Sequence, residues 1–120
     1  MEGAAHGCQT YNIIMDIKKI KAVYFVGAGG IGMSAIARYF IKKGYVVAGY
    51  DKTRTQLTSQ LEKEGMLLHY EENVDEIPQA CKKAQSCLVV YTPAIPDDHK
   101  ELVYFRQNGF EIQKRAQVLG

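Results

Sequence analysis

The feature that most constrains this sequence is a glycine cluster between an apolar run and a helix-like pattern, within residues 23–37. The run Val23–Val26 is rich in β-branched and aromatic residues, as in a buried parallel strand, and apolar residues at helical spacing follow the glycines. Gly27, Gly29 and Gly32 satisfy the G-x-G-x-x-G pattern in the strand–turn–helix context that it requires. In this pattern the first glycine permits the tight turn, the second lets the backbone approach a diphosphate, and the third allows close packing of helix and strand. Free N–H groups at the start of the helix would then bind the anion.

The motif predicts a diphosphate site without identifying the molecule that carries the diphosphate. The other interpretation is a strand-to-helix turn in which the glycines serve packing alone. We favour the diphosphate site because both flanking elements, the strand and the helix, are indicated by the sequence.

The rest of the chain alternates apolar runs with helical patterns, which predicts βαβ units and a parallel sheet covered on both faces. The expected fold is α/β, Rossmann-like and doubly wound, with right-handed crossovers and five strands in the order 3-2-1-4-5. The ligand crevice of such a sheet lies at the carboxyl ends of strands one and four. The strands are expected at residues 21–26, 45–50, 66–70, 87–91 and 110–112.

Capping signals locate the helices between these strands. The first helix carries its apolar side chains on one face, and basic residues in its last turn complement the helix dipole before a glycine ends it. The face expected to be buried consists of Ile31, Ala35, Ile36, Tyr39 and Phe40. The capping signals are Thr53–Gln56 for the second helix, Asn73 for a short helical segment, Asp97 and Asp98 for the helix that ends at Gly109, and Lys114 for a last helix.

Length and composition limit the classes of protein to consider. A chain of 120 residues is expected to form one domain, here residues 17–120, after an extension over residues 1–16 that is expected to be disordered. The formal net charge is +2 and no basic stripe is interleaved with aromatic residues, which argues against a nucleic-acid or membrane specialist. Cys8, Cys81 and Cys87 are odd in number and lack C-x-x-C spacing, as expected for reduced thiols in the cytoplasm, and no metal site is predicted.

Three loops are expected to meet over one ligand: the glycine turn, the loop after the second strand and the loop after the fourth. Asp51 ends the second strand, where a carboxylate can accept hydrogen bonds from sugar hydroxyls; the alternative is a cap for the next helix. Lys52 and Arg54 either neutralise phosphate charge or are solvated, and Thr53 is expected to be at least partly engaged as a cap.

The loop after the fourth strand, Thr92–Pro96, contains two prolines. Prolines remove backbone donors and make a loop rigid, which suits a ligand site and is also common after any buried strand. His69 and His99 are expected to be ordinary surface or half-buried histidines, because no nucleophile–base pair can be inferred from their neighbours.

The glycine turn with its Gly-Met-Ser sequence, the acidic end of the second strand and the Ala-Ile-Pro loop together resemble the N-terminal domain of the Mur ligases. The resemblance implies a bacterial, cytoplasmic enzyme of peptidoglycan synthesis that has three domains and forms an amide bond with ATP. Within the family, the similarity is to the branch that joins L-alanine to UDP-N-acetylmuramate, ahead of those that add D-glutamate or recycle a tripeptide. The resemblance covers about residues 17–119 and is carried by residues 27–34, Asp51, residues 90–96 and residues 114–116.

By that resemblance the chain is the domain that holds the UDP sugar, while ATP and Mg²⁺ bind a middle domain and a last domain helps to bind the amino acid. The ATP loop G-x-x-x-x-G-K-[ST] is absent from the sequence, so the chain is expected to hold no catalytic residue and to be inactive by itself. Ala28 stands where the family usually has Ile, and Thr92-Pro93 where it often has Ser-Ser.

The resemblance also implies the residues of the UDP-sugar site. They are Gly29, Gly30, Ile31, Gly32 and Met33 along the diphosphate, Asp51 and Lys52 facing the uridine, Thr92, Pro93, Ala94 and Ile95 lining the nucleotide–sugar crevice, and Arg115 approaching the far side. Gly27, Ser34 and Thr53 complete the predicted site. Two other classes stay open: an NAD(P)-binding Rossmann domain of a dehydrogenase or redox sensor, in which Asp51 would bind a ribose, and a nucleotide-sensing module without chemistry.

Overall fold

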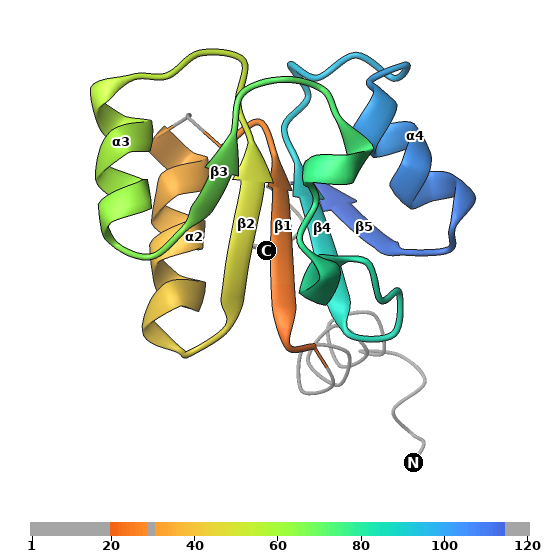
Figure 1. The fold of residues 1–120 in the computed structure, drawn as a ribbon, viewed down its shortest axis with the longest axis horizontal. Coiled ribbons are helices and arrows are strands. Elements are labelled where there is room, and N and C mark those ends of the chain that lie inside the picture. Colours follow the sequence, from red (N-terminus) through yellow and green to blue (C-terminus); the bar gives the residue numbers. More distant parts are fainter. Residues whose placement is uncertain (1–19, 29–30, 115–120) are drawn as a thin grey trace, which may run out of the picture.

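The computed structural model describes residues 20–28 and 31–114, which form a five-stranded, all-parallel sheet with helices on both faces (Figure 1). The strand order is β3-β2-β1-β4-β5, so the predicted doubly wound arrangement is confirmed. The strands are β1 (Ala22–Val26), β2 (Val46–Tyr50), β3 (Leu67–His69), β4 (Cys87–Tyr91) and β5 (Glu111–Lys114). The helices are α2 (Ile31–Lys42), α3 (Gln56–Lys63) and α4 (Lys100–Gln107), with the short 3-10 turns η2 (Val74–Glu76) and η3 (Gln79–Cys81).

The central strand β1 ends in register with its two neighbouring strands. It is buried along its whole length and pairs with β2 on one side and β4 on the other. Its last residue, Val26, lies opposite both Tyr50 and Tyr91, the last residues of those two strands. The three loops that leave β1, β2 and β4 therefore start side by side.

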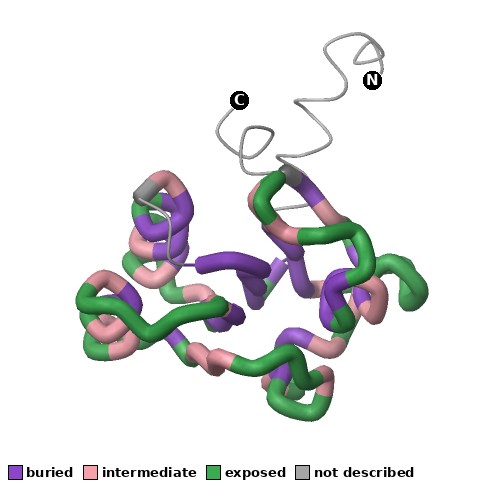
Figure 2. Tube along the Cα trace, turned by 90° about the horizontal axis from the view of Figure 1, so that it is seen from above, coloured by how far each residue is buried: buried purple, intermediate pink, exposed green. Residues whose placement is uncertain are grey.

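Each face of the sheet has its own apolar layer. Side chains alternate along β1, so Phe25 packs with Phe40 of α2 and Leu61 of α3, whereas Tyr24 packs on the opposite face with Phe105 of α4. Figure 2 shows the central strands mostly in purple, with green, exposed turns on the helices around them, as expected when both faces of a parallel sheet are covered.

The buried stripe of α2 differs from the predicted one. Ala35 is exposed and Tyr39 is 55% exposed; the Tyr39 ring packs edge-on against Phe40, with the Lys43 ammonium 5.6 Å from its centroid. The buried apolar residues of α2 follow the helical spacing i, i+3, i+4, i+7 from residue 33, and Ala35 and Tyr39 fall outside that spacing, on the solvent side of the helix. The residues that pack into the core are Met33, Ile36, Ala37 and Phe40.

Helices α3 and α4 begin later than the sequence indicated. The cap of α3 is Thr55 instead of Thr53: its Oγ accepts from the Thr58 N–H at 3.1 Å, and the Thr58 hydroxyl accepts from the Thr55 N–H at 2.8 Å. The cap of α4 is His99, after the predicted Asp97 and Asp98. Asn73 caps η2 as predicted, through its bond from the Asp75 N–H at 3.0 Å.

At the C-terminal end of the described residues, β5 extends to Lys114, which pairs with Tyr91, so the prediction that Lys114 begins a helix is wrong. Residues 115–119 of that predicted helix, and the predicted N-terminal extension with Cys8, lie outside the described residues. Within residues 20–28 and 31–114, no helix is long and apolar enough to cross a membrane.

Candidate ligand-binding site

The glycine turn lies directly against the loop after β4. A Cβ atom placed on Gly27 would lie 2.6 Å from Thr92 Cγ2, closer than Cβ atoms pack, and 3.2 Å from Ile95 Cδ1, which is a tight contact. Gly27 also has a φ of +92°, a backbone conformation that residues other than glycine rarely adopt. The predicted role of this glycine in a tight turn is therefore confirmed on two independent grounds.

The same turn is tied to the end of β2. The N–H groups of Gly27 and Ala28 both donate to the carbonyl of Tyr50, at 2.8 and 2.9 Å. These two donors are therefore used inside the protein. Asp51 comes directly after Tyr50, and the three loops predicted to converge therefore do lie together.

Two side chains at the start of α2, those of Met33 and Ser34, face the protein interior. Met33 belongs to the apolar layer of that face, and the side chain of Ser34 is buried. Gly32 is half-buried in the same turn. Three other predicted site residues, Gly29, Gly30 and Arg115, lie outside the described residues. Ile31 is described by its backbone alone.

Asp51 is held in place by backbone hydrogen bonds. Its N–H donates to the carbonyl of His69 at 3.2 Å, and its Oδ2 accepts from the Thr53 N–H at 3.1 Å. Because Thr55 caps α3, the interpretation of Asp51 as the cap of that helix is wrong, and so is the capping role expected of Thr53. Asp51 is half-buried, whereas Lys52 and Thr53 are exposed.

Arg54 is engaged within the protein. Its guanidinium lies 4.4 Å from the centroid of the Tyr70 ring and donates to Glu62 Oε1 at 3.0 Å. The Arg54 side chain is 63% exposed, so it is solvated while it also stacks on Tyr70 and pairs with Glu62.

The loop Thr92–Pro96 is a tight turn. The Ile95 N–H donates to the Thr92 carbonyl at 3.0 Å, and the Ala94 N–H donates to the Thr92 hydroxyl at 3.4 Å. Thr92 and Ile95 are half-buried against the rest of the protein, and Pro93 and Ala94 are exposed at the rim. The loop is thus tied by two hydrogen bonds and exposes Pro93 and Ala94 to solvent.

Sequence reasoning missed a buried polar cluster on the α4 side of the sheet. Glu101, in the first turn of α4, is 0% exposed and bonds the side chains of Tyr24 and His69. Burial, and after it the negative charge of Glu101, raises the pKa of the Tyr24 phenol far above its usual range, so Tyr24 remains a donor. His99 is also buried, unlike the surface or half-buried histidine expected. The one signal in the sequence was the spacing of Glu101 with Leu102 and Phe105, which places it on the buried face of its helix.

The cysteines of the described residues pack as apolar groups. Cys81 and Cys87 are both buried, and both are free thiols, as predicted. The pKa of the Cys87 thiol is raised well above its usual range, chiefly by a hydrogen bond with Cys81 and secondly by burial. Among residues 20–28 and 31–114, no three His, Cys, Asp or Glu side chains gather as metal ligands would.

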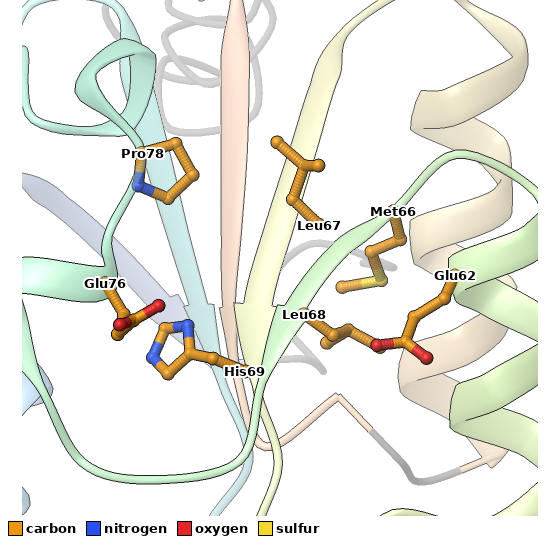
Figure 3. Close-up of a pocket in the computed structure, with 7 residues that line it drawn as sticks. All are labelled: Glu62, Met66, Leu67, Leu68, His69, Glu76 and Pro78. Atoms are coloured by element: carbon orange, nitrogen blue, oxygen red, sulfur yellow. The ribbon is translucent and has the colours of Figure 1, made fainter.

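A separate hollow of about 400 Å³ lies at the outer edge of β3 (Figure 3). Leu68 and Met66 line one side of the strand, while His69 and Glu76 lie on the other. None of the predicted site residues lines it.

The chain matches the family model described as "Mur ligase family, catalytic domain" over residues 22–120. Among curated proteins it is 62% identical over 106 residues to the UDP-N-acetylmuramate–L-alanine ligase of Parabacteroides distasonis and 58% identical to that of Phocaeicola vulgatus. Each match covers 88% of this chain and 23% of the relative, so the chain spans about a quarter of their length.

Solved structures of the same kind are similar in fold. The UDP-N-acetylmuramate–alanine ligase of Thermotoga maritima aligns with a TM-score of 0.72 and 33% identity over 82% of this chain and 21% of that one. The UDP-N-acetylmuramate:L-alanyl-γ-D-glutamyl-meso-diaminopimelate ligase of Neisseria meningitides aligns with a TM-score of 0.69 at 20% identity, over 83% of this chain and 30% of that one.

Proposed function

Since the chain belongs to the Mur ligase family, we propose that it forms the UDP-sugar-binding part of an ATP-dependent ligase that joins L-alanine to UDP-N-acetylmuramate. The relatives with the highest identities quoted above carry that name, and the solved ligase at 33% identity shares the strand arrangement. The substrates, the reaction and its place in the cytoplasm are part of this proposal.

The observation that carries the proposal is the convergence of three loops at one edge of the sheet. The glycine turn contacts Thr92 and Ile95 and is hydrogen-bonded to Tyr50, directly before Asp51. Amides that follow Ala28 at the start of α2 would hold the diphosphate, because their donors and the helix dipole both favour an anion. The half-buried Asp51 carboxylate accepts hydrogen bonds, as recognition of a uridine with its ribose hydroxyls and imide N–H requires.

The chain's own contribution to the reaction would be binding and orientation. In the proposed ligase, ATP phosphorylates the muramoyl carboxylate, and the amine of L-alanine then attacks the acyl phosphate to give the amide, ADP and phosphate. The sequence contains no phosphate-cradling lysine loop, and the described residues offer no carboxylate cluster for Mg²⁺, so these residues do not fit Mg–ATP. Lys52 and the rim loop Thr92–Ile95 are assigned to the nucleotide sugar.

A thermal-shift and calorimetric titration tests this proposal directly. UDP-N-acetylmuramate at about a hundred times its Kd is expected to stabilise the chain by about 2.7 kcal/mol, whereas NAD at equal concentration leaves the melting temperature unchanged. Asp51→Asn is expected to weaken UDP-N-acetylmuramate binding about tenfold, because a hydrogen bond from the ligand to a charged carboxylate contributes about 1.5–3 kcal/mol to the binding free energy. Asp75→Asn is the matched control, since Asp75 is an exposed carboxylate on η2.

Two results would contradict the proposal. Stabilisation by NAD and not by the UDP sugar would assign the glycine turn to a dinucleotide. Equal affinities of the Asp51 and Asp75 variants for the UDP sugar would remove Asp51 from the site.

A further inference from the structure

The carboxylate of Glu101 is fully buried and links helix α4 to strand β1, to strand β3 and to the loop after β3. Its Oε1 accepts from the Tyr24 hydroxyl of β1 at 2.5 Å. Its Oε2 lies 2.6 Å from His69 Nε2 at the end of β3, and accepts from the N–H of Asn73, in the loop after β3, at 3.0 Å. A charge removed from water is tolerated only when it is paired and hydrogen-bonded, and here both oxygens are.

His69 connects this carboxylate to the sheet's edge strand. In Figure 3 its side chain leaves β3 on the side of Glu76 and away from Leu68, as alternation along a strand requires. The imidazole is 12% exposed. Strand β3 has only three residues and pairs with β2 alone, so side-chain contacts help to hold its last residue. Besides Glu101, His69 Nε2 lies 3.2 Å from the Tyr24 hydroxyl, and the imidazole lies near the rings of Tyr24 and Tyr50. The bond to Glu101 ties that end of the strand to α4.

The backbone of His69 in turn holds the candidate nucleotide-binding residue. Its carbonyl accepts from the Asp51 N–H at 3.2 Å, and Asp51 Oδ2 accepts from the Thr53 N–H at 3.1 Å. A continuous path of hydrogen bonds thus runs from a buried carboxylate on one face of the sheet to the loop at its carboxyl edge. Loss of the Glu101–His69 bond would release the end of β3, and with it the acceptor of the Asp51 amide.

We propose that Glu101 and His69 are positioning residues that hold Asp51 in the geometry for nucleotide binding. The inference rests on the proposed function for the identity of the ligand. A purely structural cluster would stabilise the fold without acting selectively on Asp51. Three variants separate these roles because they break different bonds of the same carboxylate.

His69→Leu removes the donor to Oε2, while His69→Gln places an amide N–H at the same bond count from Cα and restores it. Tyr24→Phe is the matched control, because it removes the donor to Oε1, together with the 3.2 Å contact between the Tyr24 hydroxyl and His69 Nε2, and leaves the bond between Glu101 Oε2 and His69 in place. Should His69→Leu not fold, His69→Asn, whose amide is one bond shorter, makes the same comparison.

The first measurement is amide hydrogen exchange in the chain without ligand. His69→Leu is expected to speed exchange of the Asp51 amide at least about tenfold beyond the change in global stability, because a hydrogen bond to a charged group is lost locally. In His69→Gln and Tyr24→Phe this amide should follow global stability alone. The inference is overturned if the Asp51 amide responds equally in His69→Leu and Tyr24→Phe, or in neither.

The second measurement is the Kd for UDP-N-acetylmuramate at a temperature where every variant is folded. We expect about a tenfold weaker Kd for His69→Leu, recovery in His69→Gln, and no change in Tyr24→Phe. Equal Kd values for all variants would refute the positioning role. A wild-type chain that binds no UDP sugar would refute the proposed function instead, and the exchange experiment would still decide whether Glu101 and His69 position Asp51.

Discussion

Replacing Gly27 by Ala tests the geometry of the candidate site most sharply, because the added methyl meets two separate penalties. The backbone φ of +92° strains any residue with a Cβ, at about 1–2 kcal/mol. The new Cβ would also lie 2.6 Å from Thr92 Cγ2, and a β-branched side chain cannot rotate freely away. Overpacking of this kind destabilises by about 1–3 kcal/mol, so we expect the free energy of unfolding to fall by about 3 kcal/mol.

A double-mutant cycle with Thr92→Ser separates the two penalties. Serine lacks the Cγ2 methyl, so Gly27→Ala combined with Thr92→Ser should recover the steric part, about 1–2 kcal/mol, and leave the backbone strain. Urea unfolding of the four proteins, followed by circular dichroism, gives the free energies. Additive effects of the two substitutions, or a loss below about 1 kcal/mol for Gly27→Ala alone, would refute the contact between the glycine turn and the Thr92 loop.

Two further predictions concern the helices that flank the site. Thr55→Ala is expected to lower the free energy of unfolding by about 1 kcal/mol through loss of the cap, and Thr53→Ala by less than about 0.5 kcal/mol; urea unfolding that ranked them in the opposite order would contradict the observed start of α3. Arg38 hydrogen-bonds Glu64 at 2.8 Å and lowers the pKa of that carboxyl below its usual 4.5, so the pair stabilises the fold at neutral pH and this contribution is lost as the pH falls through the lowered pKa. Arg38→Gln should raise the Glu64 pKa toward 4.5 in a carbon-detected NMR titration, and an unmoved titration curve would show that Arg38 is not its cause.

The strands and their order followed from local sequence. The run at residues 87–91 is apolar and β-branched, and β4 has the predicted bounds, Cys87–Tyr91. The order β3-β2-β1-β4-β5 followed from alternating strands and helices together with right-handed crossovers. The convergence of the glycine turn with the loop at Thr92 was a consequence of that order.

Helix starts were less accessible from the sequence because several residues in a row can cap. Thr53 and Thr55 both carry an acceptor hydroxyl, and Asp97 competes with His99 in the same way. At the start of α3 the structure selects Thr55, which exchanges two hydrogen bonds with Thr58, a residue that is itself buried. Thr53 and Thr55 carry the same hydroxyl, so the burial of Thr58, which follows from tertiary packing, distinguishes the two sites where the sequence alone does not.

The sequence by itself determined the parallel sheet, the glycine turn and the edge at which Asp51 and the Thr92 loop meet. These depend on side-chain periodicity and on backbone conformations that glycine alone adopts readily, and both are properties of short segments. Only the tertiary structure decided that Glu101 is buried and that His69 binds it, since the two residues are 32 positions apart and belong to different elements. A buried charge is recognisable only when its donors are known, and those donors are brought together by the packing of α4 against the sheet.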